Sequence, residues 1–580
     1  MICKQVPLKK GKAIKMRFPF SKPLRRSSDE GHKPALSAAS SRNRVVIAMG
    51  CFIAVYGVIG GRLIQYGMTD LEQGRSYGSI NRNMAARPDL VDRNGAIMAS
   101  DIRVASLYGE PRRIIDPDEA VEALTSVLPN VDYKEWHRKL SSGAGFVWLR
   151  REITPKQQAQ VLALGIPGIG FRNETRRFYP GGPNASHILG LVDIDNAGIS
   201  GIEKFIDNQG IGALQALGLD ASEELAPVRL SIDAGVQHIL RDELMTAMDK
   251  YQAIAAGAII LNAKTGEVVA MASVPDYDPN NPFNANDKDR LNRMAAGTYE
   301  MGSTFKAFTT AMALDSGKVN LNSRFDASKP IKIARFTIND FHGKKRVLTV
   351  PEVFIYSSNI GTAKMADVVG IEGHRAFLKK LGLLDMLKTE LPETARPLEP
   401  KEWKKLNSIT ISFGHGVTTT PLQTAMAAAA LVNGGKLIKP TFLPRTKEEA
   451  DAMGEQVISA KTSAEMRYLF RLNVEQGSGR NAEVDGFYMG GKTGTAEKVI
   501  NGKYSSNVRF NAFLAAFPID DPEYVVLTIV DEPKPVEGQY SATAGLNAAP
   551  MVQSIIRRSA SLLGIQPKFH NDREALQVSY

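Results

Sequence analysis

An apolar run that begins at Ser303 sets the strongest limit on how this chain can fold. The run continues to about Leu314, includes Lys306 and is followed by Gly317. It leaves little polar surface, so we expect a helix that lies buried at the centre of a domain and ends at the glycine. Because residues three apart share one face of a helix, Lys306 can reach the Ser303 hydroxyl.

This serine and this lysine form a candidate catalytic pair. A serine is a poor nucleophile until a neighbouring base takes its proton, and a lysine removed from water can lower its pKa far enough to do so. Backbone N–H groups at a helix N-terminus would also point at a negatively charged oxygen formed beside Ser303. Ser303 is therefore the candidate nucleophile and Lys306 the candidate base.

Two further motifs follow along the chain. Ser357-Ser358-Asn359 comes first, and Lys492-Thr493-Gly494-Thr495 lies beyond it. Ser-x-x-Lys occurs once, whereas Ser-x-Asn occurs four times and only the copy at Ser357 falls between the other two motifs. The order Ser-x-x-Lys, Ser-x-Asn, Lys-Thr-Gly is typical of penicillin-recognising serine acyltransferases.

The chain is too long for a single core, since it has 580 residues. Residues 66–226 mix short apolar runs with turn residues and paired charges, and they contain no nucleophile–base pair. We expect a stalk or docking module there, with Arg87 and Glu203 in structural ion pairs. The composition shifts at Pro227, which predicts a second domain over residues 227–565 and a polar tail over residues 566–580.

The second domain mixes helix and strand patterns. Val228–Asp233 reads as a strand, Ala234–Lys250 as an amphipathic helix, and residues 256–273 as a hairpin. After Lys492 the pattern turns to strands again, with an Asn-Gly turn between them. We therefore expect an α+β domain in which Lys492 lies on an antiparallel edge strand against the helix of Ser303.

The N-terminus predicts a membrane anchor. Residues 1–44 hold twelve Lys and Arg against two acidic residues, so they carry +10 of the net charge of +11. Val45–Gly61 contains seventeen uncharged residues, and Leu63 and Ile64 extend it past Arg62, so the segment 45–65 is just long enough to cross a bilayer. The basic flank places the N-terminus in the cytoplasm and the catalytic domain in the periplasm, across the inner (plasma) membrane. A cleaved signal peptide is the alternative, but no Ala-x-Ala-like site follows.

Small residues recur along one side of the expected span, at Gly50, Ala54, Gly57 and Gly61. They offer close approach to another helix, although glycine is also common in such spans. Outside the basic tail the chain is nearly neutral, which argues against nucleic acid as a partner. The eight histidines show no ligand spacing, so neither a metal nor another cofactor is expected. The two cysteines, Cys3 and Cys51, lie in the basic tail and in the expected span, so no disulfide is expected in the exported part.

Three other patterns suggest competing functions. Residues 486–493 satisfy the phosphate-loop pattern G-x-x-x-x-G-K-[ST], but a polar stretch precedes them and a hairpin signal follows. Glu402 resembles a deacylating glutamate, but one residue too many separates it from Leu406-Asn407. A second Lys-Thr-Gly at Lys264 is explained by a tight turn.

Longer matches extend the resemblance from the motifs to the whole chain. The chain resembles the class B penicillin-binding proteins over nearly everything after residue 45. The matching segments of a transpeptidase domain are Gly257–Ile260, Lys264–Glu267, Ala270–Ser273, Asn292-Arg293, Gly302–Lys306 and Gly491–Ala496. Those of the family's pedestal, or dimerisation-like, domain are Asp92–Gly95 and Gly198–Glu203. The resemblance implies a membrane-anchored protein with an elongated pedestal and a penicillin-binding domain, built from an antiparallel sheet flanked by helices with an all-helical subregion.

The same resemblance implies roles for the motif residues. Lys306 takes the proton of Ser303, which attacks a peptidoglycan stem peptide at its penultimate D-alanine, and Ser357 relays a proton to the departing D-alanine. Asn359 orients Lys306 and the substrate amide. The residues expected to hold the oxyanion and the terminal carboxylate are Lys492, Thr493, Gly494 and Thr495. β-Lactams would acylate Ser303 in the same way.

Among subfamilies the chain is most similar to the septal, division-specific transpeptidase. Ser412–Gly416 and Thr420–Gln423 fit that branch, and the elongation branch commonly has aspartate at the position of Asn359. The expected partner is a polytopic glycosyltransferase of the division machinery. The alternatives are an elongation-type transpeptidase, a β-lactam-binding sensor or scaffold, and an exported nucleotide-binding protein.

Overall fold

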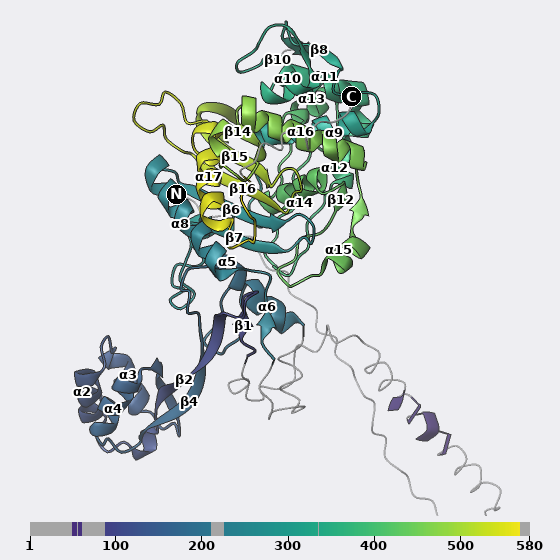
Figure 1. Cartoon of the computed structure of the whole chain (residues 1–580). Coiled ribbons are helices and arrows are strands. Elements are labelled where there is room, and N and C mark those ends of the chain that lie inside the picture. Colours follow the sequence, from purple (N-terminus) through teal and green to yellow (C-terminus); the bar gives the residue numbers. More distant parts are fainter. Residues whose placement is uncertain are drawn as a thin grey trace, which may run out of the picture. The chain divides into compact units, whose positions relative to one another are not determined.

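A computed structural model describes residues 87–209, 226–333, 336–500 and 502–568, with residues 49–50, 52–54, 56–57 and 59–60 (Figure 1). The chain divides into two compact units, Met1–Ser79 and Ile80–Tyr580. In the first unit the described residues are helical, and the rest of the predicted span, including Gly61, and the tail 1–44 lie outside them. No helix among the described residues is long and apolar enough to cross a membrane.

The pedestal is built on a five-stranded sheet with the strand path β3-β2-β1-β5, in which β4 also pairs with β2. Its strands are β1 (Leu90–Val91), β2 (Ile97–Gly109), β3 (Val147–Ile153), β4 (Ile169–Phe178) and β5 (Val228–Arg229). Three helices share a separate apolar core with β2 and β3. They are α2 (Pro117–Val127), α3 (Tyr133–Leu140) and α4 (Pro155–Ala163).

A buried ion network holds the pedestal together. Arg177 Nε donates to Glu203 Oε1 over 2.7 Å, and both side chains are fully buried. Arg87 Nε donates to the other oxygen of Glu203 over 2.9 Å, and Arg177 also reaches Asp101. Glu203 lies on α6 (Gly201–Asn208). The predicted structural role of Arg87 and Glu203 is confirmed, because each buried charge has an opposite partner.

The strand predicted at residues 228–233 is shorter than expected. Only Val228–Arg229 forms a strand, and it pairs in parallel with β1 of the pedestal sheet. The chain then turns, because the Asp233 carboxylate accepts a hydrogen bond from Val236 N and caps α8 (Ala234–Tyr251). The turn at Asp92 packs beside this cap, where Asp92 Oδ2 accepts from Ala234 N.

The transpeptidase sheet has five antiparallel strands in the order β14-β15-β16-β6-β7. They are β14 (Gly490–Ile500), β15 (Lys503–Phe517), β16 (Tyr524–Asp531), β6 (Ala255–Asn262) and β7 (Val268–Val274). Every residue of β7 and β16 is buried, so helices cover both faces of the sheet. The predicted antiparallel sheet, with Lys492 on the edge strand β14, is confirmed.

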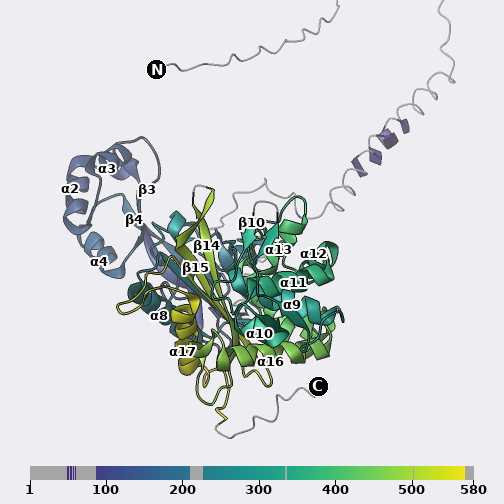
Figure 2. The same cartoon turned by 90° about the horizontal axis from the view of Figure 1, so that it is seen from above.

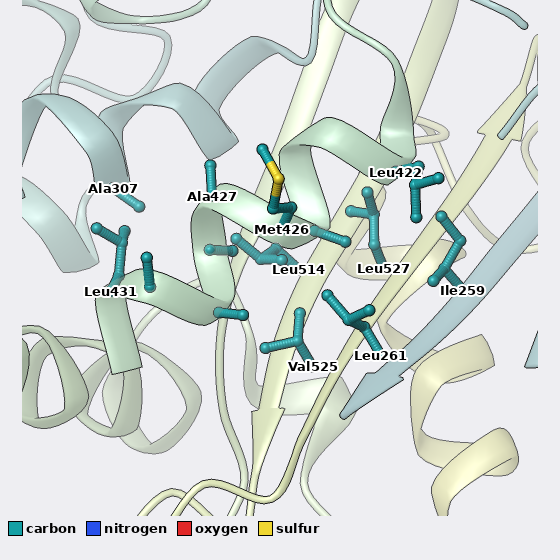
Figure 3. Close-up of a cluster of buried hydrophobic side chains, with 14 of the residues drawn as sticks. Ile259, Leu261, Ala307, Leu422, Met426, Ala427, Leu431, Leu514, Val525 and Leu527 are labelled. Atoms are coloured by element: carbon teal, nitrogen blue, oxygen red, sulfur yellow. The ribbon is translucent and has the colours of Figure 1, made fainter. Parts of the chain in front are cut away.

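Alternate residues of β6 enter two different cores, as the two-residue period of a strand requires. Ala256, Ala258 and Ile260 pack with α8 and α17 (Ala548–Ser559). Ile259 and Leu261 face the other side, where α14 (Pro421–Val432) lays Leu422 and Met426 against β15 and β16 (Figure 3). Figure 2 shows α8 and α17 on one side of the sheet and α9 (Phe305–Asp315) on the other.

Further helices form a subregion beyond α9. They are α10 (Val350–Ile355), α11 (Asn359–Val369), α12 (Ile371–Lys380), α13 (Lys405–Ser412) and α16 (Ala460–Gln476). The prediction of an all-helical subregion was wrong in one respect, because two short antiparallel pairs lie among these helices. They are β8 (Arg324–Asp326) with β11 (Val347–Thr349), and β9 (Ile331–Ile333) with β10 (Phe336–Ile338). These three-residue strands carry too short a pattern to be told from loops.

A buried histidine in this subregion predicts a pH-dependent stability. His374 on α12 is fully buried, its Nδ1 lies 2.9 Å from Ser408 Oγ, and burial lowers its pKa to about 4 from 6.5. The unfolded chain binds this proton more tightly, so stability is full above pH 6.5 and falls as the pH drops toward 4. The loss should approach ~3 kcal/mol.

Urea denaturation of the full chain at pH values between 4 and 8 measures this effect. His374→Gln, which retains a hydrogen-bonding group for Ser408, should flatten the dependence in that window. An unchanged pH dependence in the folded variant would show that another group is responsible.

Candidate active site

The nucleophile candidate lies in a short turn immediately before a buried helix. Gly302–Thr304 forms a 3₁₀ turn, and α9 begins at Phe305. Phe305 to Leu314 are all buried, which confirms the expected central helix, although Ser303 precedes the α-helix rather than starting it. Gly302 has a φ of +53°, a conformation that favours glycine. Ser303 is half-buried at this junction, whereas the Lys306 side chain is enclosed.

Lys306 points toward the second motif. Its Nζ donates to Ser357 O over 2.5 Å and to Ser357 Oγ over 3.0 Å. Ser357 lies between α10 and α11, as predicted for an interhelical loop, and has a φ of +54°. A non-glycine residue in this conformation is strained. The surrounding contacts therefore hold Ser357 in place with its hydroxyl toward Lys306.

The third motif brings a second buried lysine to the same hydroxyl. Lys492 Nζ lies 3.1 Å from Ser357 Oγ and 5.7 Å from the centre of the Phe354 ring. The Lys492 side chain is fully buried. Ser357 Oγ thus stands between two amines, each of which can donate to its oxygen or, when neutral, accept its proton.

Both amines have lowered pKa values. Burial, followed by the nearby Lys492 charge, holds the pKa of Lys306 well below its ordinary 10.5, while Asp340 acts in the opposite direction. Burial alone lowers the pKa of Lys492 to about 7. Desolvation disfavours a charged ammonium, and the repulsion between two ammonium groups beside one hydroxyl favours the loss of a proton from one of them. A neutral lysine is therefore available as a base near neutral pH.

Strand β14 lies directly against the turn of the nucleophile. A Cβ on Gly494 would come within 2.5 Å of Met301 O, and one on Gly302 within 2.8 Å of Thr495 O. Thr493 Oγ1 lies 2.6 Å from Ser478 Oγ, and Thr495 Oγ1 accepts from Ala544 N over 3.1 Å. The two glycines allow the close approach that brings Thr495 beside Ser303.

We predict that Gly494→Ala separates the strand from the turn. The added methyl would meet a backbone oxygen that cannot move alone, so overpacking should cost about 1–3 kcal/mol and slow acylation by penicillin. Gly143→Ala in the pedestal is a matched control, since a Cβ there meets nothing within 4 Å and the glycine does not have a positive φ. Thermal melting and acylation rates of the two variants check this, and normal acylation by Gly494→Ala would contradict the close packing.

Asn359 contacts the residue that follows β10. Its Nδ2 donates to Asn339 O over 2.9 Å, while the expected role toward Lys306 and the substrate amide stays a prediction. Asp340 accepts from Ser358 Oγ over 2.8 Å and from Ile360 N over 3.0 Å. Asn339 and Asp340 therefore anchor the Ser357 loop. Sequence reasoning missed both residues, because they belong to a polar loop with no motif of its own.

The structure excludes the phosphate-loop alternative. Lys492 and Thr493 belong to β14, so a strand follows where a phosphate loop requires the N-terminus of a helix. Lys264-Thr265-Gly266 forms the β6–β7 turn, with Gly266 at a φ of +74°, as expected. Glu402 is exposed and pairs with Lys404 on the surface. Within the described ranges no cluster of three His, Cys, Asp or Glu side chains could hold a metal ion.

Comparisons with known proteins show the family of this chain. A family model described as the penicillin binding protein transpeptidase domain matches residues 256–557, and one described as the penicillin-binding protein dimerisation domain matches residues 82–212. A curated relative, the probable peptidoglycan D,D-transpeptidase FtsI of Caulobacter vibrioides, is 39% identical over 91% of this chain and 90% of its own length. The chain belongs to the class B penicillin-binding proteins. This membership confirms the two-domain architecture and the transpeptidase class.

Two further relatives of this penicillin-binding protein span most of both chains. The probable peptidoglycan D,D-transpeptidase PenA of Neisseria meningitidis is 34% identical over 83% of this chain and 85% of its own. The stage V sporulation protein D of Bacillus subtilis is 31% identical over 92% of this chain and 88% of its own. The similarity therefore includes the pedestal as well as the catalytic domain.

Proposed function

We propose that this penicillin-binding protein cross-links septal peptidoglycan by D,D-transpeptidation through an acyl-enzyme on Ser303. The observation that carries the proposal is the pair of buried lysines on either side of the Ser357 hydroxyl, one of which, Lys306, lies in the first turn of the helix that follows Ser303. A lysine with a lowered pKa can take the serine proton without an additional base. Membership of the class supports the transpeptidation reaction, and the geometry of the site supports the roles proposed for its residues.

In the proposed acylation, neutral Lys306 takes the Ser303 proton as Oγ attacks the carbonyl of the penultimate D-alanine. Backbone N–H groups of Ser303 and Thr495 receive the developing oxyanion. The proton then passes through Ser357 Oγ to the departing D-alanine amine, because that hydroxyl contacts Lys306 directly. The amine of a second stem peptide later attacks the acyl carbonyl, which frees Ser303 and completes the cross-link.

The terminal carboxylate of the donor stem peptide can bind near Lys492 and the two threonines of β14. The pKa of Lys492 is about 7. A carboxylate that binds nearby raises this pKa, because an opposite charge favours the protonated lysine, so Lys492 is positively charged when the donor is bound. Thr493 and Thr495 add hydroxyl groups on the same strand. The site is therefore suited to a peptide that ends in a free carboxylate, as stem peptides and β-lactams do.

The septal assignment rests on the relatives and on two positions in the site. The Caulobacter relative carries the name FtsI. This chain has Asn359 where the elongation branch commonly has aspartate, and Lys492-Thr493-Gly494 where that branch commonly has Lys-Ser-Gly. We further propose a single-pass inner-membrane anchor over residues 45–65 and a polytopic glycosyltransferase as partner. The uncharged Val45–Gly61 segment and its basic flank support the anchor.

Exchange of the terminal D-alanine tests the proposed reaction. The full chain, with un-cross-linked glycan strands as donor and a labelled D-amino acid as acceptor, should release D-alanine and incorporate the label, whereas Ser303→Ala should do neither. A sensor would bind fluorescent penicillin without this exchange. Depletion in cells separates the two transpeptidase branches, because septal loss gives filaments and loss of elongation gives round cells.

A further inference from the structure

Glu300 lies three residues before the nucleophile and has no role in the mechanism above. Its carboxylate accepts hydrogen bonds from Gly416 N over 2.7 Å and from Tyr504 OH over 3.1 Å. His415 Nδ1 lies 3.2 Å from its second oxygen. These four residues, Glu300, His415, Gly416 and Tyr504, form the Glu300 cluster.

The members of the Glu300 cluster come from three segments of the site. Glu300 belongs to the segment that leads into the Gly302–Thr304 turn. His415 and Gly416 follow α13, and Tyr504 is the second residue of β15, opposite Val499 of β14. The cluster thus joins the nucleophile's turn to the far end of the hairpin that carries Lys492 and Thr495.

Backbone packing on either side of Glu300 leaves little freedom. Tyr299 and Thr419 exchange two backbone hydrogen bonds of 3.0 Å. On the other side, Gly414 has a φ of +91°, and a Cβ there would come within 1.9 Å of Gly302 O. The loop 413–416 therefore presses directly on the residue before Ser303.

Ring packing extends the contact between the loop and the hairpin. The His415 ring meets Tyr504 edge-on, with centroids 5.4 Å apart, and lies 5.7 Å from Phe413. Tyr299 stacks on Phe510 of β15 at 4.3 Å. Such aromatic pairs stabilise a contact beyond their buried area.

The charges within the cluster suit these hydrogen bonds. Burial works against the charged carboxylate, but hydrogen bonds from His415 and Gly416 N outweigh it and hold the pKa of Glu300 below its ordinary value. Burial and the Glu300 charge raise the pKa of Tyr504 to about 12. At neutral pH Glu300 is therefore an acceptor and Tyr504 a donor.

We propose that Glu300 is a positioning residue for acylation, which holds the β14–β15 hairpin and the loop 413–416 against the turn of Ser303 through Tyr504, His415 and Gly416. The inference rests on the proposed role of Ser303. The two oxyanion donors lie on the parts that this cluster joins, Ser303 on the turn and Thr495 on β14. Loss of the cluster should therefore loosen their spacing without removing a reacting group.

Stopped-flow acylation of the full chain by a fluorescent penicillin tests the proposal. Tyr504→Phe keeps the ring and removes one hydrogen bond, so the acylation rate constant at saturating penicillin should fall about three- to tenfold. Glu300→Gln weakens all three contacts and should lower it about ten- to a hundredfold. Adding Tyr504→Phe to Glu300→Gln should cause a smaller loss than Tyr504→Phe causes in the wild type, because the two changes affect one interaction.

Matched controls come from distant hydrogen bonds of the same kinds. Tyr133→Phe removes a tyrosine–carboxylate hydrogen bond of 2.8 Å to Asp118 in the pedestal, and Glu399→Gln changes a carboxylate that accepts from Arg375 and Trp403. Both should acylate as the wild type does. In Tyr504→Phe the melting temperature and the dissociation constant of the pre-covalent complex should stay unchanged, which a merely structural role would not require.

The proposal is overturned if Tyr504→Phe and Glu300→Gln acylate at the wild-type rate, or if their effects multiply in the double variant. A lower melting temperature that accounts for the slower rate in Tyr504→Phe would also overturn it. Ser303→Ala separates this inference from the proposed function. If Ser303→Ala still forms the adduct, the proposed chemistry fails, whereas normal rates in both cluster variants beside an inert Ser303→Ala reject the positioning role alone.

Discussion

Lys306→Arg should lower the rate of acylation by penicillin by about two to four orders of magnitude. The guanidinium keeps a positive charge but cannot lose its proton near neutral pH, so it cannot act as the base. The wild-type lysine can, because burial and Lys492 hold its pKa well below 10.5. Rates of covalent labelling at saturating fluorescent penicillin provide the measurement.

Lys318→Arg is the matched control, since Lys318 follows α9 and is exposed. It should acylate normally. Circular dichroism and thermal melting establish that Lys306→Arg is folded, which matters because the Lys306 side chain is almost fully enclosed. A folded Lys306→Arg protein with a near-normal rate would remove Lys306 from the mechanism.

Ser357→Gly should separate activity from stability. The change deletes the hydroxyl between Lys306 and Lys492, so acylation should fall by about two orders of magnitude or more, as expected for loss of a proton relay. The backbone φ of +54° is readily adopted by glycine, whereas it is strained for serine. Glycine therefore relieves this strain, and the melting temperature should not fall. Labelling rates and melting curves of one preparation test both expectations.

The exposed surface of the same subregion supplies the control for Ser357→Gly. Lys345 also has a positive φ, of +53°, and Lys345→Gly should leave acylation unchanged while relaxing a comparable backbone conformation. If Ser357→Gly acylates normally, Ser357 is not the relay. If it unfolds, the strain inferred for this position is mistaken.

The parts of the fold that follow a long, regular pattern were predicted from the sequence. The fully apolar run after Ser303 became the buried α9, and the hairpin at residues 256–273 became β6 and β7. The order of the three motifs also placed Lys306, Ser357 and Lys492 in one site. Motif order is informative here because, in the proposed mechanism, the groups of all three motifs act on one substrate, and the fold must then bring them together.

Contacts made by irregular segments could not be predicted. Asp340 anchors the Ser357 loop through Ser358 and Ile360, yet its own sequence neighbourhood is an ordinary polar loop. The Glu300 cluster joins residues from three distant segments, and no local periodicity links them. Val228–Arg229 joined the pedestal sheet because strand pairing depends on a partner, β1, that lies far away in the sequence.

The most direct test of the account is the location of the covalent adduct. The full chain is incubated with penicillin and digested, and the modified peptide is sequenced by mass spectrometry. The account predicts a single penicilloyl group on Ser303, absent from Ser303→Ala and strongly reduced in Lys306→Arg. An adduct on another serine, or no adduct on a folded wild-type protein, would contradict the claim that a neutral Lys306 activates Ser303.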